Sequence, residues 1–405
     1  MKYSDEGVEM SNWNTKTLGE LTSYIAKGIP PVYVEEKTND TVFVLNQKCN
    51  RNYRISYDDS RLHNNAIKKV PDVKMLKPGD VLINSTGTGT AGRVAQIWDI
   101  KAPTTFDGHM ILMRPTDEIE PLYYGYAIKA YQSTIESFAE GSTGQTEINK
   151  SRLQNELLIS YPVDKNKQVA ISRILAAIDE KTLLNEKINE NLLQQMESLY
   201  KAWFKAFVPF GGRRPSDWKE SDIYSIADII YGAPFSSNLF NTYGEGLPII
   251  RIRDLKEQAF VTYTTEKHPK GHLIQPGDIV VGMDGEFRPY LWGNTEAWLN
   301  QRVCIFCNKR PQGKAFVFFT IKPLLYQVEQ KQVATTVIHI GKKDYDSFKF
   351  FLPDIDTLDQ FDSITTPMIN RIVTNCLENR RLVETRDALL PRLMSGELDV
   401  SDIDL

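Results

Sequence analysis

Apolar residues recur every seven positions between Ile171 and Trp203, in a stretch without Gly or Pro. This spacing is typical of a long helix that packs along one side against a partner helix. One row of the pattern contains an amide, Asn185, and a buried amide is tolerated opposite only one partner position. We therefore predict a coiled coil whose register Asn185 sets. The seam positions predicted in this helix are Ile171, Ile174, Ile178, Asn185, Ile188 and Leu192.

A second helical stretch downstream carries the same pattern. Adding 198 to Ile171, Ile178, Asn185 and Leu192 gives Ile369, Cys376, Val383 and Leu390, all apolar and in a second Pro-free run from Met368 to Leu390. The same offset moves Pro78-Gly79-Asp80 onto Pro276-Gly277-Asp278. An offset shared by a turn and a helix indicates an internal duplication, so the chain supplies its own partner helix. The seam positions predicted in the second helix are Ile369, Ile372, Cys376, Val383 and Leu390.

The rest of each copy consists of short apolar runs and turns. Strands are predicted at Thr41 to Leu45, after each Pro-Gly-Asp turn and at Met110 to Met113, and one helix from Leu122 to Phe138. These patterns predict an α+β fold in which two repeated mixed α/β domains are separated by a long antiparallel coiled coil of two helices. The predicted parts are a first domain (1–163), its long helix (164–208), a linker (209–215), a second domain (216–353), and a second long helix with the C-terminal tail (354–405).

Composition restricts the class of protein. The 405 residues are 41% hydrophobic and 25% charged, which is enough for more than one core. No apolar run approaches the length of a membrane span, the polar start does not resemble a signal peptide, and four Cys without a paired framework suit a reducing compartment. We expect a cytoplasmic protein without membrane contact. Because the net charge is -4, a nucleic acid would have to bind at local basic patches.

Motifs for catalysis are incomplete in this sequence. Gly87, Gly89 and Gly92 spell a dinucleotide-binding pattern, but the residues that follow alternate like a strand instead of opening a helix. Cys304 and Cys307 form a single C-x-x-C without the second pair that a zinc site requires. We therefore predict no catalytic residue, no metal site and no cofactor bound by this chain.

A basic stretch from Asn46 to Lys77 contains eight Lys or Arg against three Asp, and phosphate is its natural counterpart. The polar loop after the first Pro-Gly-Asp turn carries short side chains that can hydrogen-bond base edges. Aligned positions of the second copy carry other side chains, which suggests two different half-sites. The candidate DNA-binding residues are Lys48, Arg51, Tyr53, Arg54, Asn84, Ser85, Thr86, Thr88, Thr90 and Arg93 in the first copy, and Arg251, Arg253, Asp284, Glu286, Arg288 and Tyr290 in the second.

The order and spacing of these elements resemble the specificity subunit of a type I restriction-modification enzyme. The resemblance rests on Trp13-x-x-x-x-Leu18-Gly19-Glu20, KPGDVLINSTGTGTAGRVA, GSTGQTEINKSRLQNELLISYP and ISRILAAIDEKTLLNEKI in the first copy. In the second copy it rests on LPIIRIRDL, QPGDIVVGMDGEF and RRLVETRDALLPRLMSGEL, whereas ATTVIHIGKKDYDSFKFFLP lacks the usual Gly-Ser/Thr-x-Gln. The stretch before the first helix adds Thr143, Gln145 and Lys150 to the candidate DNA-binding residues.

This resemblance implies a non-catalytic subunit that reads a bipartite double-stranded DNA sequence through two target recognition domains. It implies that two methyltransferase subunits dock on the central helices and that restriction subunits complete an adenine-N6 methyltransferase and site-specific deoxyribonuclease. S-adenosylmethionine, ATP and Mg²⁺ would then be bound by those partners. The residues alone leave two alternatives open: a nucleotide-binding enzyme that uses Gly87 to Gly92, and a scaffold whose domains bind other proteins.

Overall fold

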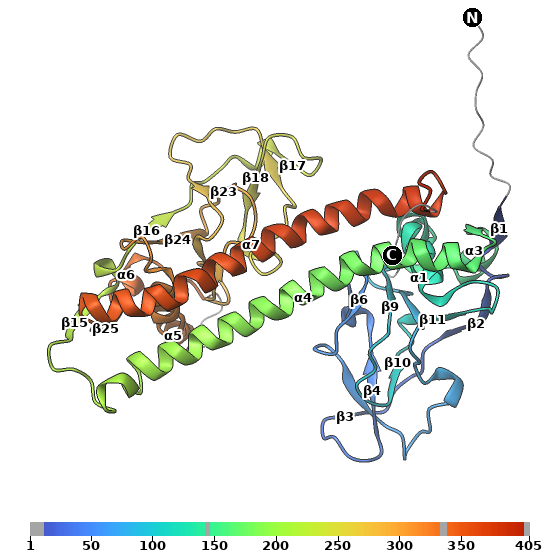
Figure 1. Cartoon of the computed structure of the whole chain (residues 1–405), viewed down its shortest axis with the longest axis horizontal. Helices are drawn as coiled ribbons and strands as arrows, with labels where there is room; N and C mark the ends of the chain where they lie inside the picture. Colours follow the sequence, from blue (N-terminus) through green and yellow to red (C-terminus); the bar gives the residue numbers. More distant parts are fainter. Residues whose placement is uncertain (1–11, 142–145, 333–337, 401–405) are drawn as a thin grey trace, which may run out of the picture. The chain divides into compact units, whose positions relative to one another are not determined.

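The computed structural model describes residues 12–141, 146–332 and 338–400, and its elements are labelled in Figure 1. The chain forms two compact units, residues 1–179 with 384–405 and residues 180–383. Each unit contains a strand-rich domain and a part of both long helices, α4 (Lys165–Phe204) and α7 (Ile355–Met394). The two long helices predicted from the heptad pattern are therefore present.

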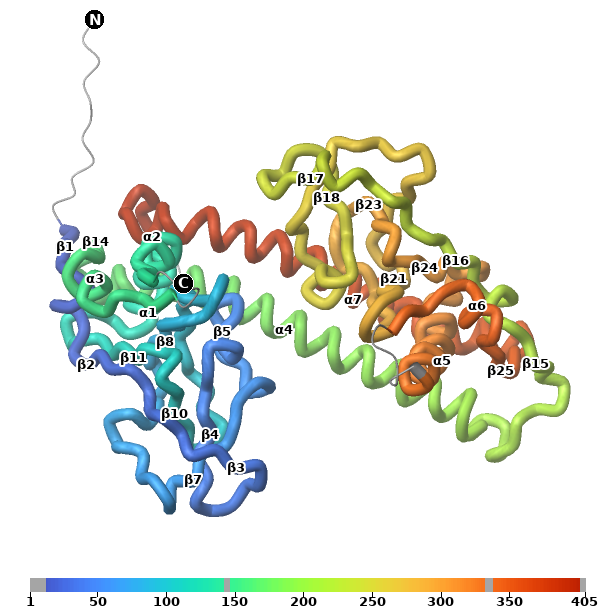
Figure 2. The backbone as a smooth tube through the Cα atoms, turned by 180° about the vertical axis from the view of Figure 1, so that it is seen from behind, coloured from blue at the N-terminus to red at the C-terminus, as the bar shows by residue number. Residues whose placement is uncertain are grey.

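The first unit is built around two four-stranded sheets, with strand orders β2-β11-β8-β9 and β10-β4-β7-β3. The first of these sheets is antiparallel throughout, whereas β10 pairs with β4 in parallel. Figure 2 shows β2, β11 and β8 beside one another. The elements of this domain are β1 (Trp13–Thr17), β2 (Thr22–Lys27), β3 (Tyr33–Val34), β4 (Thr41–Leu45), β5 (Asn50–Arg51), β6 (Arg54–Ile55), β7 (Arg61–Asn64), β8 (Val81–Asn84), β9 (Val94–Gln96), β10 (Thr104–Phe106), β11 (Met110–Pro115), α1 (Pro121–Ala130), α2 (Gln132–Ser137), β12 (Ala139–Glu140), β13 (Glu147–Ile148), α3 (Lys150–Asn155) and β14 (Leu158–Pro162).

The second unit repeats this plan. Its sheet β16-β24-β21-β22 has the order of β2-β11-β8-β9, and the parallel pair of β18 and β23 corresponds to that of β4 and β10. The shared plan supports the internal duplication. The elements of this domain are β15 (Lys219–Asp222), β16 (Ala227–Tyr231), β17 (Phe240–Asn241), β18 (Leu247–Ile250), β19 (Tyr263–Thr264), β20 (Leu273–Ile274), β21 (Ile279–Gly282), β22 (Pro289–Leu291), β23 (Ala297–Leu299), β24 (Val303–Asn308), α5 (Lys314–Gln332), α6 (Lys342–Tyr345) and β25 (Lys349–Leu352).

The offset between the two copies changes along the chain. It is 198 from Val81 to Ile279, where β8 and β21 begin, but 190 from Lys165 to Ile355, where α4 and α7 begin. The predicted constant offset of 198 is therefore wrong for the helices. Residues eight apart on a helix differ by only about 80° around its axis, so an apolar stripe still matches itself after such a shift.

One predicted helix is divided in the structure, and one long helix contains a proline. The helix predicted from Leu122 to Phe138 is divided into α1 and α2 at Tyr131, which leaves the helical conformation at φ -99° and ψ 16°. Helix α7 begins at Ile355, within the predicted part 354–405, and therefore extends beyond the Pro-free run that starts at Met368, with Pro367 inside it. The proline marked a boundary in the sequence because it lacks an N–H, yet the helix continues through it.

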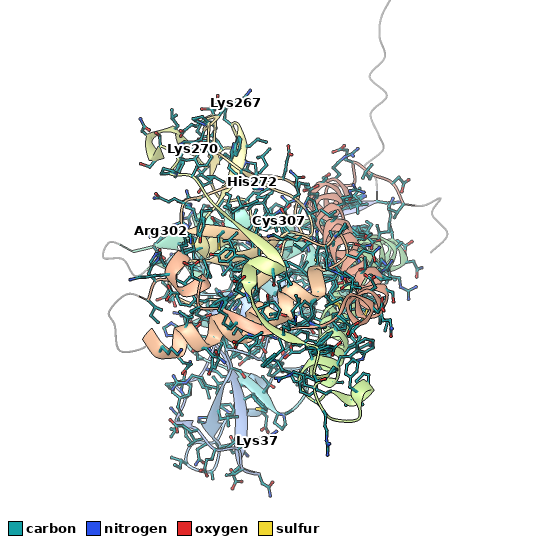
Figure 3. The ribbon with its side chains drawn as sticks, turned by 90° about the vertical axis from the view of Figure 1, so that its left-hand side faces the viewer. Lys37, Lys267, Lys270, His272, Arg302 and Cys307 are labelled. Carbon is teal, nitrogen blue, oxygen red and sulfur yellow. The ribbon has the colours of Figure 1, made fainter. Side chains whose placement is uncertain are left out.

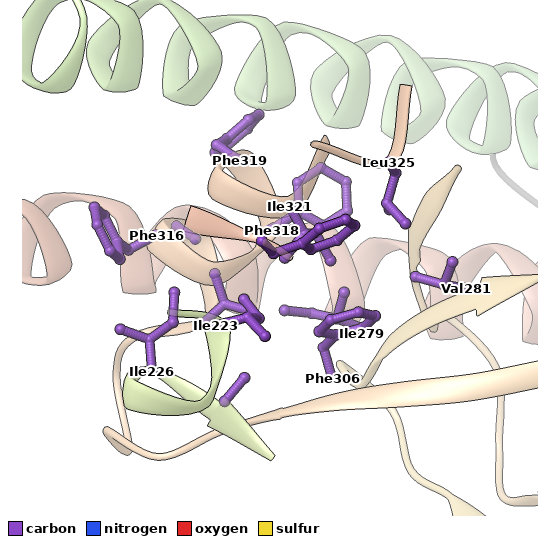
Figure 4. Packing of buried hydrophobic residues seen from close by; sticks show 14 of the residues in the cluster. Ile223, Ile226, Ile279, Val281, Phe306, Phe316, Phe318, Phe319, Ile321 and Leu325 are labelled. Atoms are coloured by element: carbon purple, nitrogen blue, oxygen red, sulfur yellow. The ribbon is translucent and has the colours of Figure 1, made fainter. Parts of the chain in front are cut away.

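The apolar ends of the long helices belong to the cores of the strand-rich domains. In the first unit, Ile171 and Leu390 are buried in the same cluster as β8, β11 and α1. In the second unit, Ile369 and Ile372 join the cluster formed by β21, β24 and α5. Figure 4 shows Phe319 of α5 pointing toward a long helix, where its ring centroid lies 5.9 Å from that of Tyr200 in α4.

The stretch where α4 and α7 pair within the second unit is polar. Asn185 donates to the side chain of Asn379, and Asn375 donates to that of Asn189, each over 2.8 Å. Numbers rise along one helix as they fall along the other, so the helices are antiparallel. With the offset of 190, Asn185 is equivalent to Asn375 and Asn189 to Asn379, so the two contacts are copies of each other.

Asn185, predicted as the one buried amide of an apolar seam, is fully buried opposite Asn379, but it is one of four paired asparagines, so the seam in this stretch is more polar than predicted. Asn185 also donates to Glu378 over 2.8 Å, and the Asn189 amide contacts the Cys376 sulfur at 3.4 Å. Among the described residues, several other predicted seam positions are only half-buried: Ile174, Ile178, Ile188, Leu192 and Val383. The heptad pattern predicted the helices correctly, and of the predicted seam residues Asn185 and Cys376 contact the opposite helix.

Candidate nucleic-acid interface

The first part of the basic stretch Asn46 to Lys77 forms the β5–β6 hairpin and the turn before it, and the rest includes β7. Lys48 and Arg51 are exposed there, and the Lys48 N–H donates to the Asn46 side chain, which caps the turn. Arg54 instead faces the helices, because its Nη2 donates to the backbone carbonyl of Asp179 in α4 over 3.3 Å. The hairpin thus exposes positive charge at the surface, and on its other side Arg54 hydrogen-bonds it to helix α4.

Tyr53 lies at the tip of this hairpin but points inward. Its side chain is only 8% exposed, its ring centroid lies 5.1 Å from that of Tyr126, and burial raises its pKa above the ordinary value. The prediction that Tyr53 interleaves the basic residues as a DNA contact is corrected, because its ring faces are covered by the core.

Asn84 and Ser85, two other candidates, are also buried. The Asn84 amide donates to the carbonyl of Gln47 over 3.0 Å, and its oxygen accepts from Asn50 over 3.1 Å. Ser85 has no exposed surface. Both residues close the end of β8 and cannot reach a base edge from these positions, so the prediction is corrected for them as well.

The glycine-rich loop after β8 folds back on itself. The side chain of Thr90 contacts the carbonyl of Thr86 at 3.4 Å, and Arg93 donates to the carbonyl of Gly89 over 3.0 Å. Thr88 is exposed at its tip. Gly87, at φ +116°, lies in a turn rather than at a helix start, and β9 follows. The geometry does not form the phosphate cradle of a dinucleotide site.

Three candidate residues, Thr143, Gln145 and Lys150, lie in the stretch before α4. Thr143 and Gln145 lie outside the described residues. Lys150 is the first residue of α3, and its amine contacts the carbonyl of Ile25 at 3.4 Å.

In the second domain the three arginine candidates each lie near an acidic side chain. Arg251 hydrogen-bonds Thr262, and Arg253 lies 3.8 Å from Asp254 but keeps two thirds of its side chain exposed. Arg288 is held by Glu329 of α5, with Nη2 to Oε1 at 3.1 Å, and this bond lowers the pKa of Glu329. Glu286 is exposed and Tyr290 half-buried.

One backbone arrangement occurs in both domains at the end of the strand after Pro-Gly-Asp. The N–H of Ser85 donates to the carbonyl of His109 over 2.8 Å, and the N–H of Met283 donates to that of Arg302 over 2.9 Å. Met283, like Ser85, is buried. The buried residue is therefore a structural position in both copies.

The next residue in each copy pairs with a third segment. Thr86 forms an antiparallel bridge with Glu147, and Asp284 forms one with His339. Three positions are thus equivalent in the two domains, and we call them the first triplet (Thr86, His109, Glu147) and the second triplet (Asp284, Arg302, His339).

The side chains of the triplets interact differently. Thr86 Oγ1 lies 2.7 Å from His109 Nδ1, and Glu147 forms an ion pair with Lys27.

In the second triplet, Asp284 lies 2.6 Å from His339 Nδ1 and 3.6 Å from Arg302 Nε. Only Thr86 and Asp284 were among the sequence candidates. His109 and Arg302 could have been found from their shared position at the start of an apolar strand, at or just before its first residue.

The described ranges contain neither a candidate metal site nor a candidate membrane span. These residues contain no group of three or more His, Cys, Asp or Glu side chains able to hold a metal ion. Cys304 is buried in β24 and Cys307, three residues on, is exposed. In the same part of the chain, every helix is too short or too polar to cross a bilayer.

Comparison with known proteins identifies the family. The model of the type I restriction modification DNA specificity domain matches residues 10–194 and again residues 215–374. The chain belongs to this family of specificity subunits and contains two of its recognition domains. The repeated match agrees with the two strand-rich domains of the structure and confirms the resemblance found in the sequence.

Relatives match along nearly the whole chain. The MjaIX specificity subunit of Methanocaldococcus jannaschii is 22% identical, with 99% of this chain and 97% of that protein covered. The HindI specificity subunit of Haemophilus influenzae is 21% identical, with 96% and 100% covered. The crystal structure of a type I S subunit from M. genitalium has the same fold, with a TM-score of 0.54, 17% identity and 99% of each chain covered.

Proposed function

We propose that this chain reads a bipartite double-stranded DNA sequence, with one half-site for each recognition domain. The observation that carries the proposal is the repeated backbone arrangement with different polar side chains at its three equivalent positions. A repeated scaffold with unlike side chains is what two different half-sites require. Of the original candidates, the exposed residues support this proposal best: Lys48, Arg51, Thr88, Arg253 and Glu286.

We further propose that the long helices dock two methyltransferase subunits. Leu183 and Leu184 support this proposal, because both expose apolar side chains in the middle of α4. In this proposal the chain itself is non-catalytic, the methyltransferase binds S-adenosylmethionine, and restriction subunits use ATP and Mg²⁺. The assembly would act on cytoplasmic DNA as an adenine-N6 methyltransferase and site-specific deoxyribonuclease. The proposed divisions of the chain are 1–163, 164–208, 209–215, 216–353 and 354–405.

Methylation mapping tests the proposed function. The chain is co-expressed with its cognate methyltransferase in a host that lacks other adenine methylation, and the genome is sequenced for methylated adenines. We expect one bipartite motif that disappears when either protein is omitted. Purified chain alone should transfer no methyl group. Methylation by the methyltransferase without this chain, at the same motif, would contradict the proposal.

A further inference from the structure

We propose that the two triplets are the base-reading positions of their domains and that Arg302 reads a guanine in the second half-site. This inference rests on the proposed DNA-reading function and specifies which residues perform it. It concerns Arg302, His109, Glu147 and His339, which the sequence patterns did not select.

The triplet positions combine a fixed backbone with exposed side chains. In the second domain, the N–H of Met283 donates to the backbone carbonyl of Arg302, and the N–H of Ile340 donates to the backbone carbonyl of Met283, each over 2.9 Å. The corresponding bond of the first domain, from Ile148 to Ser85, measures 2.8 Å. These backbone hydrogen bonds fix the positions from which the triplet side chains project. Base reading requires side chains that are held in such fixed positions.

Arg302 is the most exposed side chain of the second triplet. Its side chain is 55% exposed, compared with 31% for Asp284. Figure 3 labels Arg302 at the margin of its domain. A long cationic side chain in this position can enter a groove, whereas Arg288, held by Glu329, is turned toward α5.

The contact with Asp284 orients the guanidinium. Asp284 approaches Arg302 at Nε, the nitrogen nearest the chain, at 3.6 Å. The two terminal Nη amines lie no closer to this carboxylate than Nε does, and they are the groups that donate to O6 and N7 of guanine. His339 fixes Asp284 from the other side, with Nδ1 2.6 Å from its carboxylate. The second triplet thus presents a pair of donors in a defined direction.

The first triplet presents different chemistry on the same frame. His109 replaces the arginine, and its Nδ1 is engaged by the Thr86 hydroxyl at 2.7 Å. Glu147 occupies the position of His339 and is paired with Lys27. An imidazole cannot offer the parallel donors of a guanidinium, so we expect the two domains to prefer different bases at the equivalent step.

The decisive experiment uses the full chain bound to its methyltransferase and a library of sites randomised in both half-sites. Arg302→Lys keeps the positive charge but removes the pair of parallel donors. If Arg302 reads guanine, this variant should lose discrimination at one base pair of the second half-site by about tenfold to a hundredfold. The first half-site should keep its preference.

A transplant tests the equivalence of the triplets. Asp284→Thr, Arg302→His and His339→Glu together place the side chains of the first triplet on the second frame. We expect the base preference to change at the same pair and nowhere else. Lys349→Arg is the matched control, because Lys349 is a cation of the same domain outside the triplet, is 50% exposed and also lies 3.6 Å from a carboxylate, that of Asp222, and it should leave the preference unchanged.

Three outcomes are distinguishable. A loss of preference at one base pair in Arg302→Lys supports the inference. Unchanged preference in Arg302→Lys, with a wild-type complex that methylates a bipartite motif, overturns the inference and leaves the proposed function intact. A wild-type complex without any sequence preference overturns the proposed function itself. Thermal unfolding of each variant shows that the fold is retained, which we expect because a solvent-exposed ion pair contributes little to stability.

Discussion

At the scale of single residues, the β5–β6 hairpin and the turn before it contain both exposed and buried side chains. Lys48 and Arg51 are exposed, whereas Tyr53, between them and Arg54 in the sequence, packs on Tyr126. An exposed cation near DNA releases counterions when it meets a phosphate, and this contribution does not depend on the base sequence. The hairpin is therefore proposed as a phosphate contact rather than as a base-reading element.

This assignment predicts how hairpin variants bind. Lys48→Ala and Arg51→Ala should each weaken binding of the assembled complex similarly on all sequences. They should also flatten the dependence of log K on log salt by about one unit per lost contact. Tyr53→Phe is the control on the same hairpin, and it should bind like the wild type because the ring stays in the core. Affinities titrated at several salt concentrations decide the matter, and altered base preference in Lys48→Ala would contradict the phosphate role.

Residue types predicted the candidate surface only in part, for a physical reason. Charge in the sequence located Lys48 and Arg51, since Lys and Arg heads remain in water. The prediction that Asn84 and Ser85 contact DNA was wrong because a polar side chain at the end of a buried strand can hydrogen-bond backbone groups instead of solvent. Arg302 and His109 were missed because their partners come from segments distant in sequence, and only the backbone arrangement brings them together.

At the scale of helices and strands, the two ends of the duplicated helix pair differ in chemistry. In the first unit, Asp179 of α4 accepts from Arg386 of α7 and from the Tyr126 hydroxyl of α1, each over 2.7 Å. The Arg386 side chain is only 8% exposed. Sequence patterns did not indicate this cluster, because its members come from three helices.

The second unit has apolar residues at the same three places. The offset of 190 makes Ile369 equivalent to Asp179, and Met196 equivalent to Arg386. Helix α5 begins 193 residues after α1, which makes Phe319 equivalent to Tyr126. All three of these residues lie in one apolar cluster. The chain therefore contains a polar and an apolar version of one junction between its helices.

The apolar residues of the second unit predict which substitutions can replace the polar cluster of Asp179, Arg386 and Tyr126. Arg386→Met alone should destabilise the protein by up to about 3 to 5 kcal/mol, because it removes the cation from the Asp179 carboxylate, whose side chain is only 17% exposed. Changing Asp179→Ile and Tyr126→Phe as well should recover the loss or leave the protein more stable than the wild type, by up to about 4 kcal/mol. Chemical denaturation of the full chain measures both changes. A triple variant as unstable as the single one would show that the cluster is not an isolated ion pair in an apolar site.

At the scale of the whole molecule, the paired helices are proposed to set the number of unread base pairs between the half-sites. Each long helix has 40 residues, which corresponds to about 60 Å at 1.5 Å per residue. Because the pairing of α4 and α7 is antiparallel, adding the same number of residues to both helices at facing positions keeps every existing contact in register.

An insertion can be designed from the asparagine pairs. Asn185 faces Asn379 and Asn189 faces Asn375, so Leu183 faces the region of Arg381. Repeating residues 177–183 after Leu183, and residues 381–387 before Arg381, adds one heptad to each helix. The asparagine pairs stay on one side of the insertion and the original ion pair of Asp179 and Arg386 on the other. Each inserted residue also meets its own copied partner, including an Asp opposite an Arg.

The insertion should lengthen the helix pair by about 10 Å, which corresponds to about three base pairs at 3.4 Å per pair. Both half-sites should keep their sequences, because neither recognition domain is changed, while the preferred spacer grows. Methylation of a library of spacer lengths by the assembled complex measures this preference. The same heptad inserted into α4 alone is the control, and it should disrupt binding at every spacer because it moves the asparagine pairs out of register. If the doubly extended protein folds, binds its methyltransferase and still prefers the original spacer, the helices do not determine the distance between the half-sites.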